Sequence, residues 1–278
     1  MPRSVTRVLT AVVLLIVVVL FAFPLYYMVA TSLKPRAELF AAVPTLVPQA
    51  PTLRNYAEVL SDKNGSTLLI NSVIAGVSAT VLALIVAFAI CYPITRLPVS
   101  RRVRSFVLNW SLSLRFLPPI AVVIPYFALI RALGLYNQLP ALILVYTIFN
   151  LPLSIWMLKG FLEEIPLEIE EAAQTDGATR WQAFRSVLLP LSRTGILAAA
   201  IILFAFDWAE FLFAFILTAT PQAMTFPVGV QGLVTQFDII YNDMAAGGVI
   251  AILIPLALMI GARRYVMTGL TFGVIREK

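Results

Sequence analysis

Long apolar stretches constrain this chain more than any other feature. Several windows exceed the ~20 apolar residues that a helix needs to cross the hydrocarbon core of a membrane. Only 12% of the residues are charged and 60% are hydrophobic, whereas soluble domains carry roughly 25% charged residues. In lipid the backbone must bond to itself, so such stretches form helices, and the alternation typical of a membrane barrel is missing. The sequence therefore predicts an all-α membrane protein.

We expect six transmembrane helices within one membrane domain that covers residues 1–278. The first stretch is too long for the ~7–15-residue core of a cleaved signal peptide, and no clear cleavage site follows it. We therefore expect it to be retained as a span. The expected helices lie at about 8–30, 68–95, 105–130, 139–158, 194–218 and 245–262.

The basic residues predict the orientation of these spans, because cytoplasmic loops carry an excess of Lys and Arg. With the N-terminus inside, five basic residues fall outside: Lys34, Arg36, Arg54, Lys63 and Arg131. Fourteen fall inside: Arg3, Arg7, Arg96, Arg101, Arg102, Arg104, Lys159, Arg180, Arg185, Arg193, Arg263, Arg264, Arg276 and Lys278. We therefore expect both termini in the cytoplasm.

The residue types that are scarce exclude several kinds of chemistry. The chain has no histidine and a single cysteine, Cys91. This removes the commonest general base and the usual ligands of zinc. No GxxxxGK[ST] loop is present, so we expect nucleotide to bind elsewhere. Neither catalytic nor metal-ligating residues are predicted, and nucleic acid is not an expected partner because no basic patch interleaved with aromatics occurs.

A polar segment at 159–191 interrupts the apolar sequence. Pro166 suits the start of a helix, where its missing N–H is no loss, and Gly177 can adopt the left-handed conformation that ends one. Thr179 and Gln182 have the spacing of a capping box that opens a second helix. The segment is therefore expected to form two short helices joined by a bend.

Three interpretations of this segment compete. It is a solvated loop, a helix lying on the lipid surface, or a docking element for a soluble partner. Three basic and six acidic residues give it a net charge of −3, which weakens the second interpretation because lipid-surface helices are typically basic. Small residues at 172 and 173 permit close approach to a groove. The residues alone leave the first and third interpretations open.

The pattern Glu171-Ala172-Ala173-x3-Gly177-x9-Val187-x-Leu189-Pro190 resembles the EAA loop of permease subunits of ATP-binding-cassette (ABC) importers. The similarity extends over nearly the whole chain and looks closest to the maltose-transporter-type permeases. It includes the segments FPLYYMVATSLKP (23–35), LRNYAEVL (53–60), INS (70–72), LRFLPPIAVVIPYF (114–127), DWAEFLFAFILT (207–218) and GLTFGVIREK (269–278).

This resemblance implies a type I importer permease fold in the bacterial or archaeal plasma membrane. It implies a second permease, together with two cytoplasmic ATPases and an extracytoplasmic solute-binding protein, and it favours a heterodimer of two different permeases over a homodimer. ATP and Mg²⁺ would bind the ATPases and no cofactor would bind this chain. The segment 159–191 would be the coupling loop, with the tail from Gly269 reaching towards the ATPases and the loop at 225–229 approaching the binding protein. The coupling residues would be Glu171, Ala172, Ala173, Gly177, Trp181 and Phe184.

Charged residues within the expected spans are a separate group of candidates. Charges deep in lipid are costly and mark function or pairing. Arg115 lies in the third expected helix, whereas Asp207 and Glu210 lie in the fifth. One hypothesis pairs Arg115 with either carboxylate near a translocation path, and the other is a purely structural pair that holds two helices together.

The leading prediction is a permease subunit, not itself an enzyme, of an ATP-driven, binding-protein-dependent importer for a sugar or polyol. An importer for a non-sugar solute such as glycerol phosphate is one alternative. An ion- or proton-coupled carrier is another, although the paired repeats of such carriers are not visible. An intramembrane enzyme has little support without histidine or a GxSxG turn.

Overall fold

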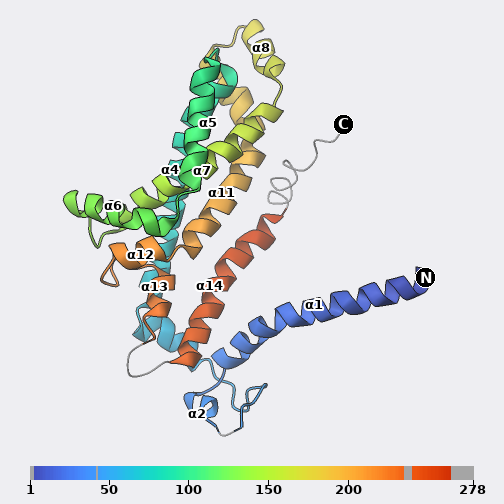
Figure 1. Cartoon of the computed structure of the whole chain (residues 1–278), viewed down its shortest axis with the longest axis vertical. Coiled ribbons are helices and arrows are strands. Elements are labelled where there is room, and N and C mark those ends of the chain that lie inside the picture. The colour runs from blue at the N-terminus through green and yellow to red at the C-terminus, as the bar shows by residue number, and fades with distance from the viewer. Residues whose placement is uncertain (1–2, 42, 235–239, 264–278) are drawn as a thin grey trace. The chain divides into compact units, whose positions relative to one another are not determined.

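A computed structural model of the protein describes residues 3–41, 43–234 and 240–263 (Figure 1). Helices form all its regular elements, and no β-strand occurs in these ranges, which confirms the predicted all-α class. Four helices are long and apolar enough to span a membrane, or up to six if each of two bent helix pairs is one span. The chain divides into two compact units, 1–66 with 229–254 and 67–228 with 255–278.

The larger unit is built around four helices that run side by side (Figure 1). Two of them extend beyond the expected spans at 68–95 and 139–158 through flanking residues that are mostly polar or charged, at 65–67, 96 and 159–164. The four are α4 (Gly65–Arg96), α5 (Arg101–Arg115), α7 (Leu139–Glu164) and α11 (Arg193–Ala209).

Small residues let these helices approach closely, as is usual in membrane bundles. A methyl group added to Gly195 of α11 would lie 2.4 Å from the Phe161 ring of α7, so only glycine fits there. Alanines occupy many buried positions of α4 and α11. One buried cluster contains Leu84, Ala87, Cys91, Ile155, Leu158, Leu162, Leu188, Ala199 and Leu203.

The third expected helix, 105–130, is not one helix. α5 ends at Arg115, and α6 (Pro119–Ala132) starts after a bend of 100°. Pro118 is extended, with ψ 134°, and Pro119 begins the new helix. A proline lacks an N–H and disfavours helical geometry in the residue before it. Two consecutive prolines therefore end the first helix, so 105–130 is not one unbroken helix, although α5 and α6 together are long and apolar enough to form one bent span.

The fifth expected helix, 194–218, is also interrupted. α11 ends at Ala209, Glu210 is extended, and α12 (Leu212–Leu217) follows. The Glu210 carboxylate accepts hydrogen bonds from the backbone N–H groups of Phe213 (2.8 Å) and Ala214 (3.1 Å). A side chain that binds the free N–H groups of a helix start stabilises a new helix. The break therefore has a local cause that apolar periodicity did not reveal.

In the smaller unit, Asn55 joins three segments. Its amide donates to the carbonyls of Ser32 (2.8 Å) and Lys34 (2.9 Å), and its oxygen accepts from the Asn242 amide (2.7 Å). The LRNYAEVL segment thus ties the end of the first helix to the start of the last. The helices of this unit are α1 (Arg3–Ser32), α2 (Arg36–Leu39), α3 (Arg54–Ala57), η1 (Glu58–Asp62) and the first part of α14 (Tyr241–Gly261).

Candidate functional site

The segment 159–191 forms two helical parts joined by a bend, as predicted. It contains α8 (Leu167–Thr175), α9 (Arg180–Ala183), the π-helical turn η2 (Phe184–Leu188) and α10 (Leu189–Leu191). In Figure 1, α8 lies at the end of the bundle formed by α4, α5, α7 and α11. The polar segment is therefore a structured projection from the larger unit.

Local sequence signals account for this shape. Pro166 precedes the first helical residue, and Gly177 has φ +95°, a conformation that favours glycine. The capping box is present, since Thr179 accepts from the N–H of Gln182 and the Gln182 side chain accepts from the N–H of Thr179. Pro190 does not stop the chain from being helical, because it lies in the first turn of α10, where its N–H is not needed.

Helix α8 presents its apolar residues outwards and buries an acidic one. Leu167 and Ile169 are 41% and 40% exposed, and Glu171 and Ala172 are exposed as well. Glu170 is the one buried residue of this helix, every residue of which the structure describes. A short helix that packed only for its own stability would show the opposite arrangement. The exposed surface of α8 therefore mixes the apolar side chains of Leu167 and Ile169 with acidic and polar ones such as Glu168 and Glu171.

The buried Glu170 forms an ion pair with Arg96 at the end of α4. The distance from Arg96 Nε to Glu170 Oε1 is 2.8 Å, and the two side chains are 5% and 3% exposed. The Arg96 Nη2 group also donates to the carbonyls of Leu162 (2.6 Å) and Ile165 (2.9 Å), where α7 ends. Burial raises the pKa of Glu170, and the positive charge of Arg96 opposes that rise. Arg96 thus links α4, α7 and α8.

Sequence reasoning missed this pair. Arg96 was counted only as a cytoplasmic charge, and Glu170 only as one of six acidic residues. One signal was present, because Arg96 is the sole charged residue of the 32-residue helix α4. The partner could not be identified, since Glu163, Glu164 and Glu168 were equally available in the same segment.

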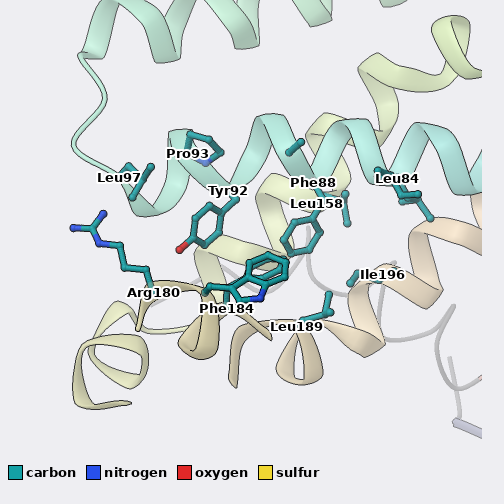
Figure 2. Close-up of a pocket in the computed structure, with 13 residues that line it drawn as sticks. Leu84, Phe88, Tyr92, Pro93, Leu97, Leu158, Arg180, Phe184, Leu189 and Ile196 are labelled. Carbon is teal, nitrogen blue, oxygen red and sulfur yellow. The ribbon is translucent and has the colours of Figure 1, made fainter. Parts of the chain in front are cut away.

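The aromatic candidates lie between the second half of the segment and α4. Phe184 makes edge-to-face contacts with Phe88 and Tyr92 of α4, with ring centroids 5.5 and 5.3 Å apart. Trp181 stacks on Phe184 at 5.1 Å and remains 65% exposed. Figure 2 shows these side chains in an apolar groove of about 750 Å³, which Arg180 borders at one end. The predicted coupling residues therefore divide, with Glu171 and Ala172 facing outwards and Phe184 facing α4.

The three charged candidates within the spans do not pair with one another. Arg115 lies over the ring of Phe206, with its guanidinium carbon 5.2 Å from the ring centroid. Glu210 caps α12, as described above. Asp207 accepts hydrogen bonds from the Asn150 amide and from the Thr80 hydroxyl (3.2 Å). The hypothesis that Arg115 pairs with either carboxylate is therefore wrong for this structure.

The loop that follows α12 is held by three polar side chains. The Asn71 amide donates to the carbonyls of Pro221 (2.9 Å) and Met224 (3.0 Å), and the Ser72 hydroxyl accepts from the N–H of Phe226. Asn137 accepts from the N–H groups of residues 219 and 220. Asn71 and Ser72 belong to the INS segment. Residues 225 and 226 are buried, so residues 219 and 222 form the exposed part of this loop. The tail from Gly269 onward lies outside the described residues.

Solved structures and curated relatives resemble this chain over most of its length. A bacterial ABC transporter involved in the import of the acidic polysaccharide alginate has a chain that matches with a TM-score of 0.79 and 21% identity, covering 95% of this chain and 98% of that one. This likeness establishes the fold.

Two curated relatives are closer in sequence. The trehalose transport system permease protein SugB of Mycobacterium tuberculosis is 34% identical over 255 residues, which is 91% of this chain and 92% of the relative. The sulfoquinovosyl glycerol transport system permease protein SmoH of Agrobacterium fabrum is 35% identical over 255 residues, 91% and 88% of the two chains. Residues 79–268 match the family described as the binding-protein-dependent transport system inner membrane component. The chain therefore belongs to this family of inner-membrane ABC importer permeases.

Proposed function

We propose that this permease docks α8 on a cytoplasmic ATPase and couples its ATP-driven movement to alternating access for a sugar or sugar derivative. The observation that carries the proposal is the exposure of Leu167, Ile169 and Ala172 on α8, a helix that projects from the bundle. Exposed apolar residues grouped on one element mark interaction sites. A short amphipathic helix entering a groove is a recurrent recognition mode.

The residues of the loop take distinct roles in this proposal. Glu171, Ala172 and Ala173 contact the ATPase, because the first two are exposed and the alanines are small enough for close approach. Gly177, with its positive φ, sets the angle between the two helical parts. Trp181 and Phe184 connect the second part to α4. ATP and Mg²⁺ bind the ATPase, and this chain is not itself catalytic.

The remaining parts of the importer follow from the family. A second permease, different from this chain, completes the translocation path, and a binding protein delivers the solute from outside. Both termini of this chain lie in the cytoplasm. The solute class is a sugar or polyol, because the names of both relatives described above refer to trehalose or to a sulfoquinovosyl glycerol.

The docking role is tested by co-purification. Glu171→Arg reverses the charge of an exposed residue of α8, and we expect the variant to be inserted normally but to lose the ATPase that co-purifies with the wild-type chain. Glu163→Arg is the matched control, because Glu163 is an exposed residue at the end of α7 and its variant should retain the ATPase. Equal retention of the ATPase by both variants would contradict the proposed contact.

The orientation is tested by labelling of introduced cysteines. Cys91 is buried, so a Cys91→Ala background gives a chain without reactive thiols. A cysteine that replaces Ala172 should react with a membrane-impermeant maleimide only when the cytoplasmic face is open to the reagent. A cysteine that replaces exposed Gln222 should react from the opposite face. Reaction of both cysteines from one side would exclude the proposed topology.

The solute class is tested on the intact assembly. Mass spectrometry of small molecules released from the co-purified binding protein should identify a sugar, a sugar glycoside or a polyol. Release of an amino acid, a metal ion or a peptide instead would refute the solute class and leave the docking role untouched.

A further inference from the structure

One face at the inner end of α4 contacts both halves of the coupling loop. Phe88, Tyr92 and Arg96 are spaced four residues apart, so they follow one another along the same side of the helix. Phe88 and Tyr92 contact Phe184 in the second half of the loop, and Arg96 contacts Glu170 in the first half. This stripe is therefore where α4 meets both helical parts.

The two contacts differ in kind. The aromatic contact is apolar and borders an open groove, so rings can slide against one another at little cost. The ionic contact is almost completely buried, and a buried charge that loses its partner is strongly disfavoured. Arg96 Nε and Glu170 Oε1 are both buried and make no hydrogen bond, so the ion pair is the contact that compensates their charges. Separation of α8 from α4 would therefore cost the charge attraction between them and leave Arg96 without its anionic partner, so the two helices are expected to move together.

Arg96 also extends the connection to α7. Its two bonds to the carbonyls of Leu162 and Ile165 hold the end of α7 against α4. These acceptors lie at the C-terminal end of α7, where Ile165 is the capping residue and its N–H also donates to the Leu162 carbonyl. A displacement of α8 thus acts on two spans of the bundle through a single guanidinium group.

We propose that Arg96 and Glu170 are positioning residues that form the joint through which movement of α8 reaches α4. Glu171 faces outwards to the motor protein and Glu170 faces inwards to the bundle, so adjacent residues of one helix serve docking and transmission separately. The inference rests on the proposed docking of α8 to an ATPase.

The test uses the intact importer purified through this chain, with ATP plus vanadate as the probe that traps the ATPase. Hydrogen–deuterium exchange is measured by mass spectrometry with and without the trap. In the wild type, trapping should change deuterium uptake both in peptides from 167–175 and in peptides from 65–96. In Glu170→Gln we expect the change at 167–175 to persist and the change at 65–96 to be lost.

Glu163→Gln is the matched control. Glu163 forms an ion pair with Lys159 at 2.6 Å on the same end of the bundle, but its side chain is 44% exposed. This variant should respond like the wild type in both segments. If Glu170→Gln does not fold, the double variant Arg96→Met with Glu170→Met replaces it. The double variant leaves no buried charge, and it still lacks the ion pair between α4 and α8.

The outcomes separate the two proposals. A wild-type chain that brings down no ATPase refutes the proposed function. Suppose that the assembly stays intact but that trapping still changes deuterium uptake at 65–96 in Glu170→Gln or in the double Met variant. The role of the Arg96–Glu170 pair in transmission is then refuted, while the proposed function stands. Loss of the response at 167–175 as well would make the pair part of docking, which also overturns the inference. If the pair had only a structural role, its removal would lower the thermal midpoint of unfolding, but trapping would still change deuterium uptake at both 167–175 and 65–96.

Discussion

Glu170 and Asp207 are two buried carboxylates of the same unit, and the protein satisfies them in different ways. Glu170, at the end of the bundle, has a cation as its partner, Arg96. Asp207, within the helices, has the neutral amide of Asn150 and the hydroxyl of Thr80. Asp207 therefore joins α11 to α7 and α4 without a second charge.

The difference follows from where each group lies. A second charge in the middle of a span would add its own desolvation cost, so neutral donors are the cheaper partners for Asp207. Near the aqueous face, the long Arg96 side chain keeps its stem among apolar residues while its guanidinium reaches polar groups. The neutral network thus holds spans to one another, whereas the charge pair holds a span to a projecting helix.

The largest expected effect comes from removing the cation. Arg96→Met leaves Glu170 buried without its charge partner and removes two bonds to the end of α7, so we expect a loss of about 3–5 kcal/mol in unfolding free energy. SDS-induced unfolding of the purified chain measures it. Lys159→Met breaks the pair with Glu163, in which the side chains are 17% and 44% exposed, and should cost only about 0–1 kcal/mol. Equal losses for the two variants would remove the distinction between buried and exposed pairs.

The second prediction tests whether Asp207 needs its charge. In Asp207→Asn the side chain can still bond to Asn150 and Thr80, so stability should stay close to that of the wild type. In Asp207→Leu both donors lose their acceptor, and we expect a loss of about 1–3 kcal/mol in the same assay. A severe loss in Asp207→Asn would show that the carboxylate acts through its charge, as Glu170 does.

Glu210 extends the comparison to a carboxylate whose partners are backbone N–H groups. Glu210→Ala should destabilise the protein by about 0.5–2 kcal/mol, because the start of α12 loses its cap. Glu210→Gln keeps an acceptor oxygen and should recover about half of that loss. Circular dichroism with thermal unfolding measures both, and an unchanged midpoint in Glu210→Ala would mean that Glu210 does not hold the break in the fifth span.

The smallest effect is a pH dependence of the Arg96→Met variant. Burial raises the pKa of Glu170 above its ordinary value of 4.5, and Arg96 opposes this, so removing Arg96 raises the pKa further. A raised pKa in the folded state gives stability that is present below the unfolded pKa and is lost as the pH rises through the folded pKa. The thermal deficit of the variant relative to the wild type should therefore be smallest near about pH 5 and grow towards about pH 8. A deficit that is constant with pH would indicate that Glu170 stays in one protonation state.

Much of the architecture was predictable because it depends on local properties. Membrane-length apolar stretches, the glycine with positive φ and the capping box of Thr179 with Gln182 act over a few neighbouring residues. The breaks at Pro119 and Glu210 were missed for different reasons. Pro118 and Pro119 are visible in the sequence, but whether they kink a helix or end it depends on how the flanking segments pack. The role of Glu210 depends on backbone groups three and four residues later, which are free only once the helix has ended.

The sequence by itself determined the class of protein, the approximate positions of its long apolar helices and the two-helix structure of the polar segment 159–191, because hydrophobic length and helix capping are written in consecutive residues. The tertiary structure alone decided which charges meet. Arg96 and Glu170 are 74 positions apart, and Arg115 was as reasonable a partner for a carboxylate as any other cation. Only the packing of α4, α7 and α8 brings Glu170, one of several acidic residues, next to Arg96. Burial makes an unpaired charge costly at that place, whereas the exposed acidic residues of α8 are solvated.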